Sequence, residues 1–358
     1  MTTKPRARDL GVPFDGTPGP LNAITDVPGI EVGHTTLIEG DHIRTGVTAV
    51  LPCGRAGIFR RVPAGSYALN GNGEMTGTLW IEDSGLLEGP LMTTNTHSVG
   101  VVRDAVISYL MQRELPGPAY DFLLPVVAET YDGFLNDING QHVTAAHAHA
   151  AIAAARSGPV AEGCVGGGTG MMTHEWKGGI GTASRLVTVN GHAFTVGVLV
   201  QSNYGTRAQL TVAGVPVGRE IAHSMPELKR NRDGSIIAWI GTDAPLLPHQ
   251  AKRLARRAAM GLARMGSTAR DSSGDIFLAF STAAYETADG LSLWRAVPPG
   301  EAINPLFQAT VEAMEEAIVN ALVAAETMTG INGSVVHALP HDELRAVLAK
   351  YGRLASVD

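Results

Sequence analysis

The stretch LKRNRDGSIIAWIGTDAPL, residues 228–246, changes character at its centre. As far as Gly234 it is charged and typical of a loop, whereas Ser235 leads into the apolar run Ile236–Ile240. A short apolar run bounded by turn residues predicts a buried strand. A glycine-serine pair at such a border is, in most proteins, only a turn before a strand. The same pair can also react.

A serine that begins a buried strand directly after a glycine can cleave the chain in front of itself. Its hydroxyl attacks the preceding carbonyl, the amide becomes an ester, and water opens the ester. Glycine suits the preceding position because it tolerates strained backbone angles and leaves the carbonyl uncrowded. Cleavage would leave Ser235 with a free α-amine of pKa about 8, which can act as the base for its own hydroxyl.

Composition predicts a single α/β domain spanning residues 1–358. The 43 glycines punctuate short apolar segments, a pattern typical of many strands joined by tight turns. Abundant alanine with only 5% aromatic residues favours closely packed helices. No linker-like tract divides the chain, so we expect one unit with helices covering strands in a layered arrangement.

Net charge and cysteine content indicate which binding partners and which cellular compartment to expect. A net charge of −7 argues against a nucleic-acid or anionic-membrane partner. The only cysteines, Cys53 and Cys164, cannot form a disulfide framework, which favours a reducing compartment. The N-terminus lacks the apolar segment of a secretory signal, and no run approaches the roughly 18 apolar residues of a membrane span. We therefore predict a cytoplasmic protein.

Hydrophobic periodicity predicts the main elements. Strands are expected within residues 21–53 and at 123–128, 186–191, 192–205 and 275–282. The strand at 123–128 is expected to carry Glu129, Thr130 and Tyr131 at its end. Helices are expected at residues 98–113, 143–156, 245–264, 305–328 and 341–350.

Familiar catalytic signatures are absent from the sequence. No serine lies in a G-x-S-x-G elbow, and THEWKG lacks the second histidine of H-E-x-x-H. The glycines around Gly166 fit neither the dinucleotide-binding nor the P-loop spacing. His142, His147 and His149 are close in sequence, but on one helix only His142 and His149 would share a face. With no carboxylate or cysteine nearby to complete a ligand set, we expect a surface helix and no metal or cofactor.

Longer blocks point to a family. GSIIAWIGTDAPLLPHQAKRLARRAAMGLARMG, residues 234–266, resembles the start of the second subunit in the self-processing L-aminopeptidase/D-esterase family, which includes the β-aminopeptidases. Further blocks resemble that family in the same order: RARDLGVPFDGTPGPLNAITDVPGIEVGHTTL, NGNGEMTG, AETYDGFLNDING, GGGTGMMTHEWKGGIGTASR, VLVQSNYG, SSGDIFLAFST and AETMTG. The resemblance covers nearly the whole chain.

The resemblance implies a fold, a processing event and an activity. It implies cleavage between Gly234 and Ser235 into fragments 1–234 and 235–358 that remain together. It also implies a four-layer αββα sandwich, shared with the ornithine acetyltransferases, and a homo-oligomer, a tetramer of processed pairs. The implied activity is an N-terminal serine aminopeptidase that acts on short peptides, amino acid amides and esters of L-amino acids, with D- and β-amino acids also within the family's range.

Roles at the reacting bond carry over position by position. Ser235 matches the nucleophile, and Asn203 matches the side-chain donor of an oxyanion hole. Ser273 and Asp275 match a Ser-x-acid pair reached by the nucleophile's amine. Members of the family that are β-aminopeptidases have glutamate where Asp275 stands. The acidic side chain of the Ser-x-acid pair is therefore one methylene shorter in this chain than in those proteins.

Three further positions concern the substrate. Tyr131 matches a phenol near the scissile bond, and Glu129 is a candidate to hold the substrate's ammonium group. Gly234 fits the aminopeptidase/esterase pattern, whereas some β-aminopeptidases have asparagine there, which favours α-amino acid substrates. Two alternatives stay open: acyl transfer as in the ornithine acetyltransferases, which use threonine as the new N-terminus, and an unprocessed, non-catalytic scaffold.

Overall fold

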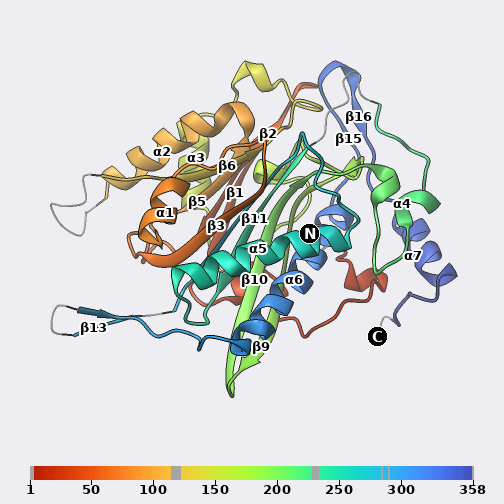
Figure 1. The fold of residues 1–358 in the computed structure, drawn as a ribbon. Coiled ribbons are helices and arrows are strands. Elements are labelled where there is room, and N and C mark those ends of the chain that lie inside the picture. Colours follow the sequence, from red (N-terminus) through yellow and green to blue (C-terminus); the bar gives the residue numbers. More distant parts are fainter. Residues whose placement is uncertain (1–3, 114–121, 228–233, 284, 289–290, 357–358) are drawn as a thin grey trace.

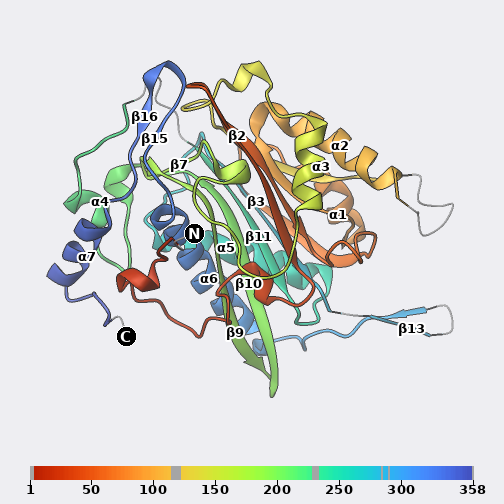
Figure 2. The same ribbon diagram turned by 180° about the vertical axis from the view of Figure 1, so that it is seen from behind.

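Two large β-sheets pack face to face, and each carries helices on its outer surface (Figure 1). The computed structural model describes residues 4–113, 122–227, 234–283, 285–288 and 291–356. Figure 2 gives the opposite view, in which α2 (Val99–Met111) and α3 (Ala145–Ala153) again lie apart from α5 (Pro248–Arg264) and α6 (Asn304–Val323). The layering is helix, sheet, sheet, helix, which confirms the predicted αββα sandwich.

The first sheet is the smaller one. Its strands in spatial order are β1 (Glu31–Glu39), β2 (Ile43–Leu51), β5 (Leu91–Asn95) and β6 (Val126–Thr130). β1, β2 and β5 pair antiparallel, whereas β6 runs parallel to β5. Its outer face packs against α2 and α3 through a cluster of small and branched side chains.

The second sheet carries Ser235. Its strands in spatial order are β4 (Leu86–Leu87), β3 (Val62–Gly71), β12 (Gly274–Ser281), β11 (Ser235–Thr242), β10 (His192–Asn203) and β9 (Gly179–Val189). β11 and β12 are parallel, and every other neighbouring pair is antiparallel. α5 and α6 cover its outer face.

Strand β11 is apolar on both faces because both faces are buried. Ile237 and Trp239 point into the core between the two sheets, whereas Ile236, Ala238 and Ile240 point toward α5 and α6. Successive side chains of a strand alternate between faces, so a strand buried on both sides reads as a continuous apolar run. The expected strand after Ser235 is thereby confirmed.

The remaining elements are short. The helices are α1 (Thr78–Ser84), α4 (Val217–Glu220) and α7 (His341–Lys350). Three two-stranded hairpins consist of β7 (Met172–Thr173) with β8 (Trp176–Lys177), β13 (Glu286–Ala288) with β14 (Leu291–Leu293), and β15 (Met328–Thr329) with β16 (Val335–Val336). Over the residues described, none of the helices has the length and apolar character needed to cross a membrane.

Several predicted boundaries were wrong. The helix expected at 245–264 begins at Pro248, because Leu247 donates its backbone N–H to Gln250 Oε1 and Pro248 occupies the first helical position. The helix expected at 305–328 ends at Val323, after which the chain enters β15. The strand expected at 123–128 lies at Val126–Thr130, so Glu129 is inside it. The helix at 341–350 is confirmed.

Candidate active site

Ser235 lies at the end of the second sheet where three strands meet. It is the first residue of β11 and pairs with Asn203, the last residue of β10. On the other side, the backbone N–H of Gly274 at the start of β12 donates a 3.0 Å hydrogen bond to Ser235 Oγ. The side chain is buried, and this hydrogen bond fixes its hydroxyl at the end of the central strands β10, β11 and β12.

Gly234 is in very close contact with the neighbouring strand. A Cβ on this residue would lie 1.5 Å from the carbonyl oxygen of Asn203 and 2.7 Å from its Nδ2. No side chain fits that space. The backbone φ of Gly234 is not in the left-handed region, so glycine is required here by close approach and not by an unusual φ.

Ser273 connects the Gly234 carbonyl to a buried carboxyl group. Ser273 Oγ lies 2.6 Å from the carbonyl oxygen of Gly234 and 2.6 Å from Asp275 Oδ1. A serine hydroxyl has one proton, so it can donate to only one of these acceptors at a time. Both contacts are satisfied together when Asp275 is protonated, donates to Ser273, and Ser273 donates to Gly234. Burial raises the pKa of Asp275 to about 6, which makes that protonated form accessible.

Asn203 has a fixed amide orientation. Its Oδ1 accepts a 2.7 Å hydrogen bond from the Met172 backbone N–H, and its Nδ2 donates at 2.9 Å to the Tyr131 carbonyl. An amide NH₂ has two protons, so one N–H remains after this contact. Since Nδ2 lies beside Gly234, that proton is available to an oxygen developing negative charge at the Gly234–Ser235 bond.

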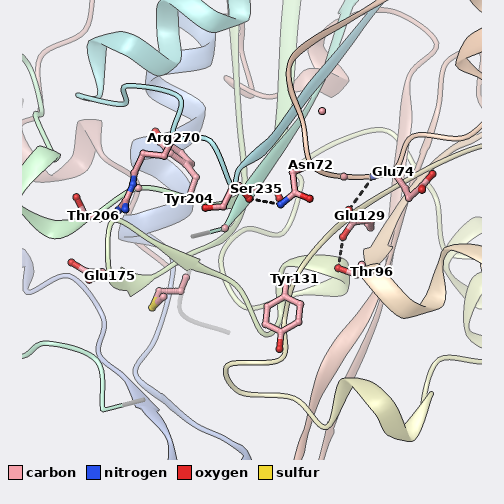
Figure 3. A pocket seen from close by; sticks show the side chains of 16 residues that line it. Asn72, Glu74, Thr96, Glu129, Tyr131, Glu175, Tyr204, Thr206, Ser235 and Arg270 are labelled. Carbon is pink, nitrogen blue, oxygen red and sulfur yellow. Dashed lines mark hydrogen bonds between the residues drawn. The ribbon is translucent and has the colours of Figure 1, made fainter. Parts of the chain in front are cut away.

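Glu129 comes from the other sheet, near the end of β6, and is buried rather than solvated. Its Oε1 accepts from the Glu74 backbone N–H at 3.1 Å, and its Oε2 accepts from the Thr96 hydroxyl (Figure 3). Burial raises the pKa of Glu129 above its ordinary value. A buried carboxylate that faces a cavity is suited to bind a cation.

Tyr131 follows β6 and contributes through its backbone carbonyl, which orients Asn203. Its ring packs edge-on against Phe134, with ring centroids 5.3 Å apart. Figure 3 shows the hydroxyl directed away from Ser235, on the side of the ring where a Cβ on Gly133 would meet it. A contribution of the phenol to chemistry stays a prediction.

Gly234, Ser235, Glu129 and Tyr131 line one cavity of about 820 Å³. Residues of both sheets and their loops line it: Gly71, Asn72, Gly73, Glu74, Thr96, Glu129, Tyr131, Met172, Glu175, Tyr204, Gly205, Thr206, Gly234, Ser235, Arg270 and Ser272. Asn72 anchors one wall by donating from Nδ2 to the Ser272 carbonyl at 2.7 Å. Asn203, Ser273 and Asp275 are not among these lining residues: Ser273 contacts Gly234, and Asp275 contacts Ser273.

Sequence reasoning did not assign a role to several lining residues. Asn72 and Glu74 lie in the glycine-rich block NGNGEMTG, and Glu175 lies in THEWKG. Both segments resemble the family, and this resemblance is the signal that could have identified these residues. Residues 174 and 175 form the tip of the β7–β8 hairpin with φ of 49° and 61°, which is unusual without glycine. Thr96 and Arg270 carry no local signal and are brought in by tertiary structure alone.

The three clustered histidines have separate partners. α3 begins at Ala145, so His142 lies outside the helix, contrary to the expectation, and contacts Asp137. His147 Nδ1 accepts from the Thr144 backbone N–H, and His149 Nε2 donates to the Ala105 carbonyl. Among the residues that the structure describes, no group of three or more histidine, cysteine or acidic side chains could hold a metal ion.

Comparisons with known proteins agree with the fold and the cavity. The sequence matches Peptidase family S58 over residues 22–336. Beta-peptidyl aminopeptidase BapA of Sphingosinicella microcystinivorans is 53% identical, over 98% of this chain and 94% of that protein. The L-aminopeptidase D-Ala-esterase/amidase of Ochrobactrum anthropi, described as a variant among the Ntn hydrolase fold, superposes with a TM-score of 0.92 at 48% identity, covering 98% of this chain and all of that one. A beta-aminopeptidase of a Burkholderia species gives 0.89 at 50% identity, covering 97% and 99%.

Fold and relatives together define a serine-type aminopeptidase with a layered αββα sandwich fold. The chain belongs to Peptidase family S58. The resemblance drawn from its sequence blocks is thereby confirmed, and the aminopeptidase is favoured over the acyltransferase and scaffold alternatives.

Proposed function

We propose that the chain cleaves itself between Gly234 and Ser235, and that Ser235 then serves as the N-terminal nucleophile of the aminopeptidase. One observation carries this proposal. The carbonyl oxygen of Gly234 is hydrogen-bonded by Ser273 at 2.6 Å, while the hydroxyl of the very next residue is held by the Gly274 N–H. Electrophile and nucleophile of one peptide unit are thus both fixed.

Cleavage proceeds through an acyl shift. Ser235 Oγ attacks the Gly234 carbonyl carbon, and the negative charge that develops on the carbonyl oxygen is stabilised by Ser273 and the remaining N–H of Asn203. The C–N bond breaks, the hydroxyl proton passes to the departing nitrogen, and an ester links Gly234 to Ser235 Oγ. Water hydrolyses this ester, leaving a carboxylate on Gly234 and a free amine on Ser235.

Turnover of peptides uses the same groups. The substrate's ammonium group binds the Glu129 carboxylate, which places the carbonyl of the first residue at Ser235. The α-amine of Ser235 takes the hydroxyl proton and returns it to the leaving amine. Asn203 again stabilises the oxyanion, and water releases the first residue from the acyl-enzyme.

Short peptides, amides and esters of amino acids are the proposed substrates. The related proteins are described as a beta-peptidyl aminopeptidase and an L-aminopeptidase D-Ala-esterase/amidase, so α-, β- and D-configured residues are all within the range to be tested. Gly234 favours α-amino acid derivatives. We further propose a cytoplasmic homo-oligomer, a tetramer of processed pairs, without metal or cofactor.

The variant S235A tests the nucleophile. It should remain a single chain and lose hydrolysis of an aminoacyl p-nitroanilide, because both reactions begin at the same oxygen. S108A is a matched control, since Ser108 lies on α2 outside the cavity lining. Processing or aminopeptidase activity that survives in S235A would refute the proposal.

A further inference from the structure

The cavity has two chemically different ends on either side of Ser235. Figure 3 shows Glu129, Thr96 and Glu74 on one side, and Arg270, Thr206 and Glu175 on the other. The first end is the proposed site of the substrate's ammonium group. A peptide bound there with its first carbonyl at Ser235 must direct the remainder of its chain, the leaving group, toward the second end.

Arg270 is the only basic residue among the described residues that line the cavity, beside three glutamates. Its guanidinium group extends toward Thr206 in Figure 3. A guanidinium group presents paired N–H donors that match the two oxygens of a carboxylate. In a cavity that is otherwise acidic, this end alone is suited to a negatively charged group.

The loop that carries Arg270 is held in place by hydrogen bonds. The Arg270 carbonyl accepts from the Ser273 backbone N–H at 3.0 Å and from Asn70 Nδ2 at 2.8 Å. The preceding Ala269 has φ of 49°, a left-handed angle that is uncommon for alanine and fixes a sharp turn. Arg270 is therefore attached to the same short loop as Ser273, three residues from the predicted relay.

Glu175 lies at the same end and opposes the binding of an anion. Its Oε2 accepts a 2.7 Å hydrogen bond from the Arg207 backbone N–H, so part of its charge is already compensated. Its backbone is held at the β7–β8 hairpin tip.

We propose that Arg270 binds the C-terminal carboxylate of the leaving group, so that di- and tripeptides with a free C-terminus are preferred over their amides. The inference rests on the proposed function of the site. An extended residue spans at most about 3.6 Å, so each further residue of the leaving group moves its terminal carboxylate farther from Ser235. A long leaving group therefore carries its carboxylate past Arg270 and loses the contact.

The test compares a dipeptide, its C-terminal amide and an aminoacyl p-nitroanilide, all with the same first residue, on wild type, R270M, R270K and R103M. Arg103 is on α2 and does not line the cavity, so R103M is the control. We expect wild type to prefer the acid over the amide in kcat/KM. R270M should lower that preference roughly threefold to fivefold through KM, with R270K intermediate, as for a charge pair at an exposed arginine.

The outcomes separate the two claims. An unchanged acid-to-amide ratio in R270M, or an equal loss on all three substrates, would overturn the role of Arg270 while leaving the proposed function intact. Failure of wild type to hydrolyse any of the three would overturn both. A gel of each variant reports folding independently, because a misfolded variant would not give the two fragments expected for wild type.

Discussion

Replacing Asp275 with asparagine should stabilise the fold while disabling the reaction. Burial raises the pKa of Asp275 from 3.8 to about 6, because the ionised carboxylate is poorly solvated beside β11. The pKa is thus about 2 units higher in the folded state than in the unfolded state. Once Asp275 is ionised, this difference lowers the free energy of unfolding by about 3 kcal/mol. Asparagine keeps the shape and carries no charge, so D275N avoids this cost.

The stability gain of D275N depends on pH, because Asp275 ionises at a higher pH in the folded state than in the unfolded state. Below pH 3.8 the carboxyl group is protonated in both the folded and unfolded states, so ionisation costs nothing. Between pH 3.8 and about 6 the unfolded state ionises first, and stability falls as the pH rises. Above about pH 6 the full cost remains. The gain of D275N over Asp275 should therefore be small near pH 4 and approach about 3 kcal/mol above pH 7.

Urea unfolding followed by tryptophan fluorescence measures this gain. The S235A background keeps every sample a single chain, so that processing does not alter the molecule being unfolded. D104N, which changes an exposed aspartate on α2, is the matched control. A difference between D275N and its parent that does not change with pH would refute the reasoning. In the Ser235 background, D275N should also slow self-cleavage, since an amide can donate a hydrogen bond to Ser273 but, unlike the carboxyl group of Asp275, cannot give up or take up a proton near neutral pH.

Three other changes test separate contacts. G234A should slow self-cleavage by more than about 100-fold on a gel, because its Cβ would lie 1.5 Å from the Asn203 carbonyl oxygen; normal processing would contradict the close contact. N203A should slow self-cleavage and, in the fraction of the protein that is processed, lower kcat by about 10²–10³ with a smaller change in KM, as expected for a lost oxyanion donor; a change confined to KM would argue against that role. E129Q should raise KM for substrates with a free amine by roughly tenfold or more, since a neutral amide cannot pair with ammonium. Burial raises the pKa of Glu129, so KM of the wild type should also rise as the pH falls through that pKa, and this rise should be absent in E129Q.

Local sequence was sufficient for the elements whose partners are close in sequence or whose burial is uniform. The run after Ser235 reads as a strand because both of its faces are buried, and α7 has its predicted bounds. Helix ends were less predictable. The helix that begins at Pro248 was extended back to Pro245, since proline is accepted throughout a first turn and only the Gln250–Leu247 contact fixes the start.

The site itself depends on contacts between distant segments. Ser235 and Asn203 meet because β10 and β11 pair, and Glu129 reaches the same cavity from the other sheet. Hydrophobic patterns predict neither the order of strands nor which loops share a cavity. The candidate roles of these residues came from the family resemblance. Thr96 and Arg270 lie in none of the blocks that resemble the family. Their place in the cavity follows only from the folded structure.

Mass spectrometry of the intact purified protein under denaturing conditions tests the central claim most directly. The account predicts two species, one ending at Gly234 and one beginning with an unblocked Ser235 and running to residue 358. A single uncleaved chain of 358 residues that hydrolyses peptides at full rate would contradict it, because Ser235 would then have no free amine to act as base.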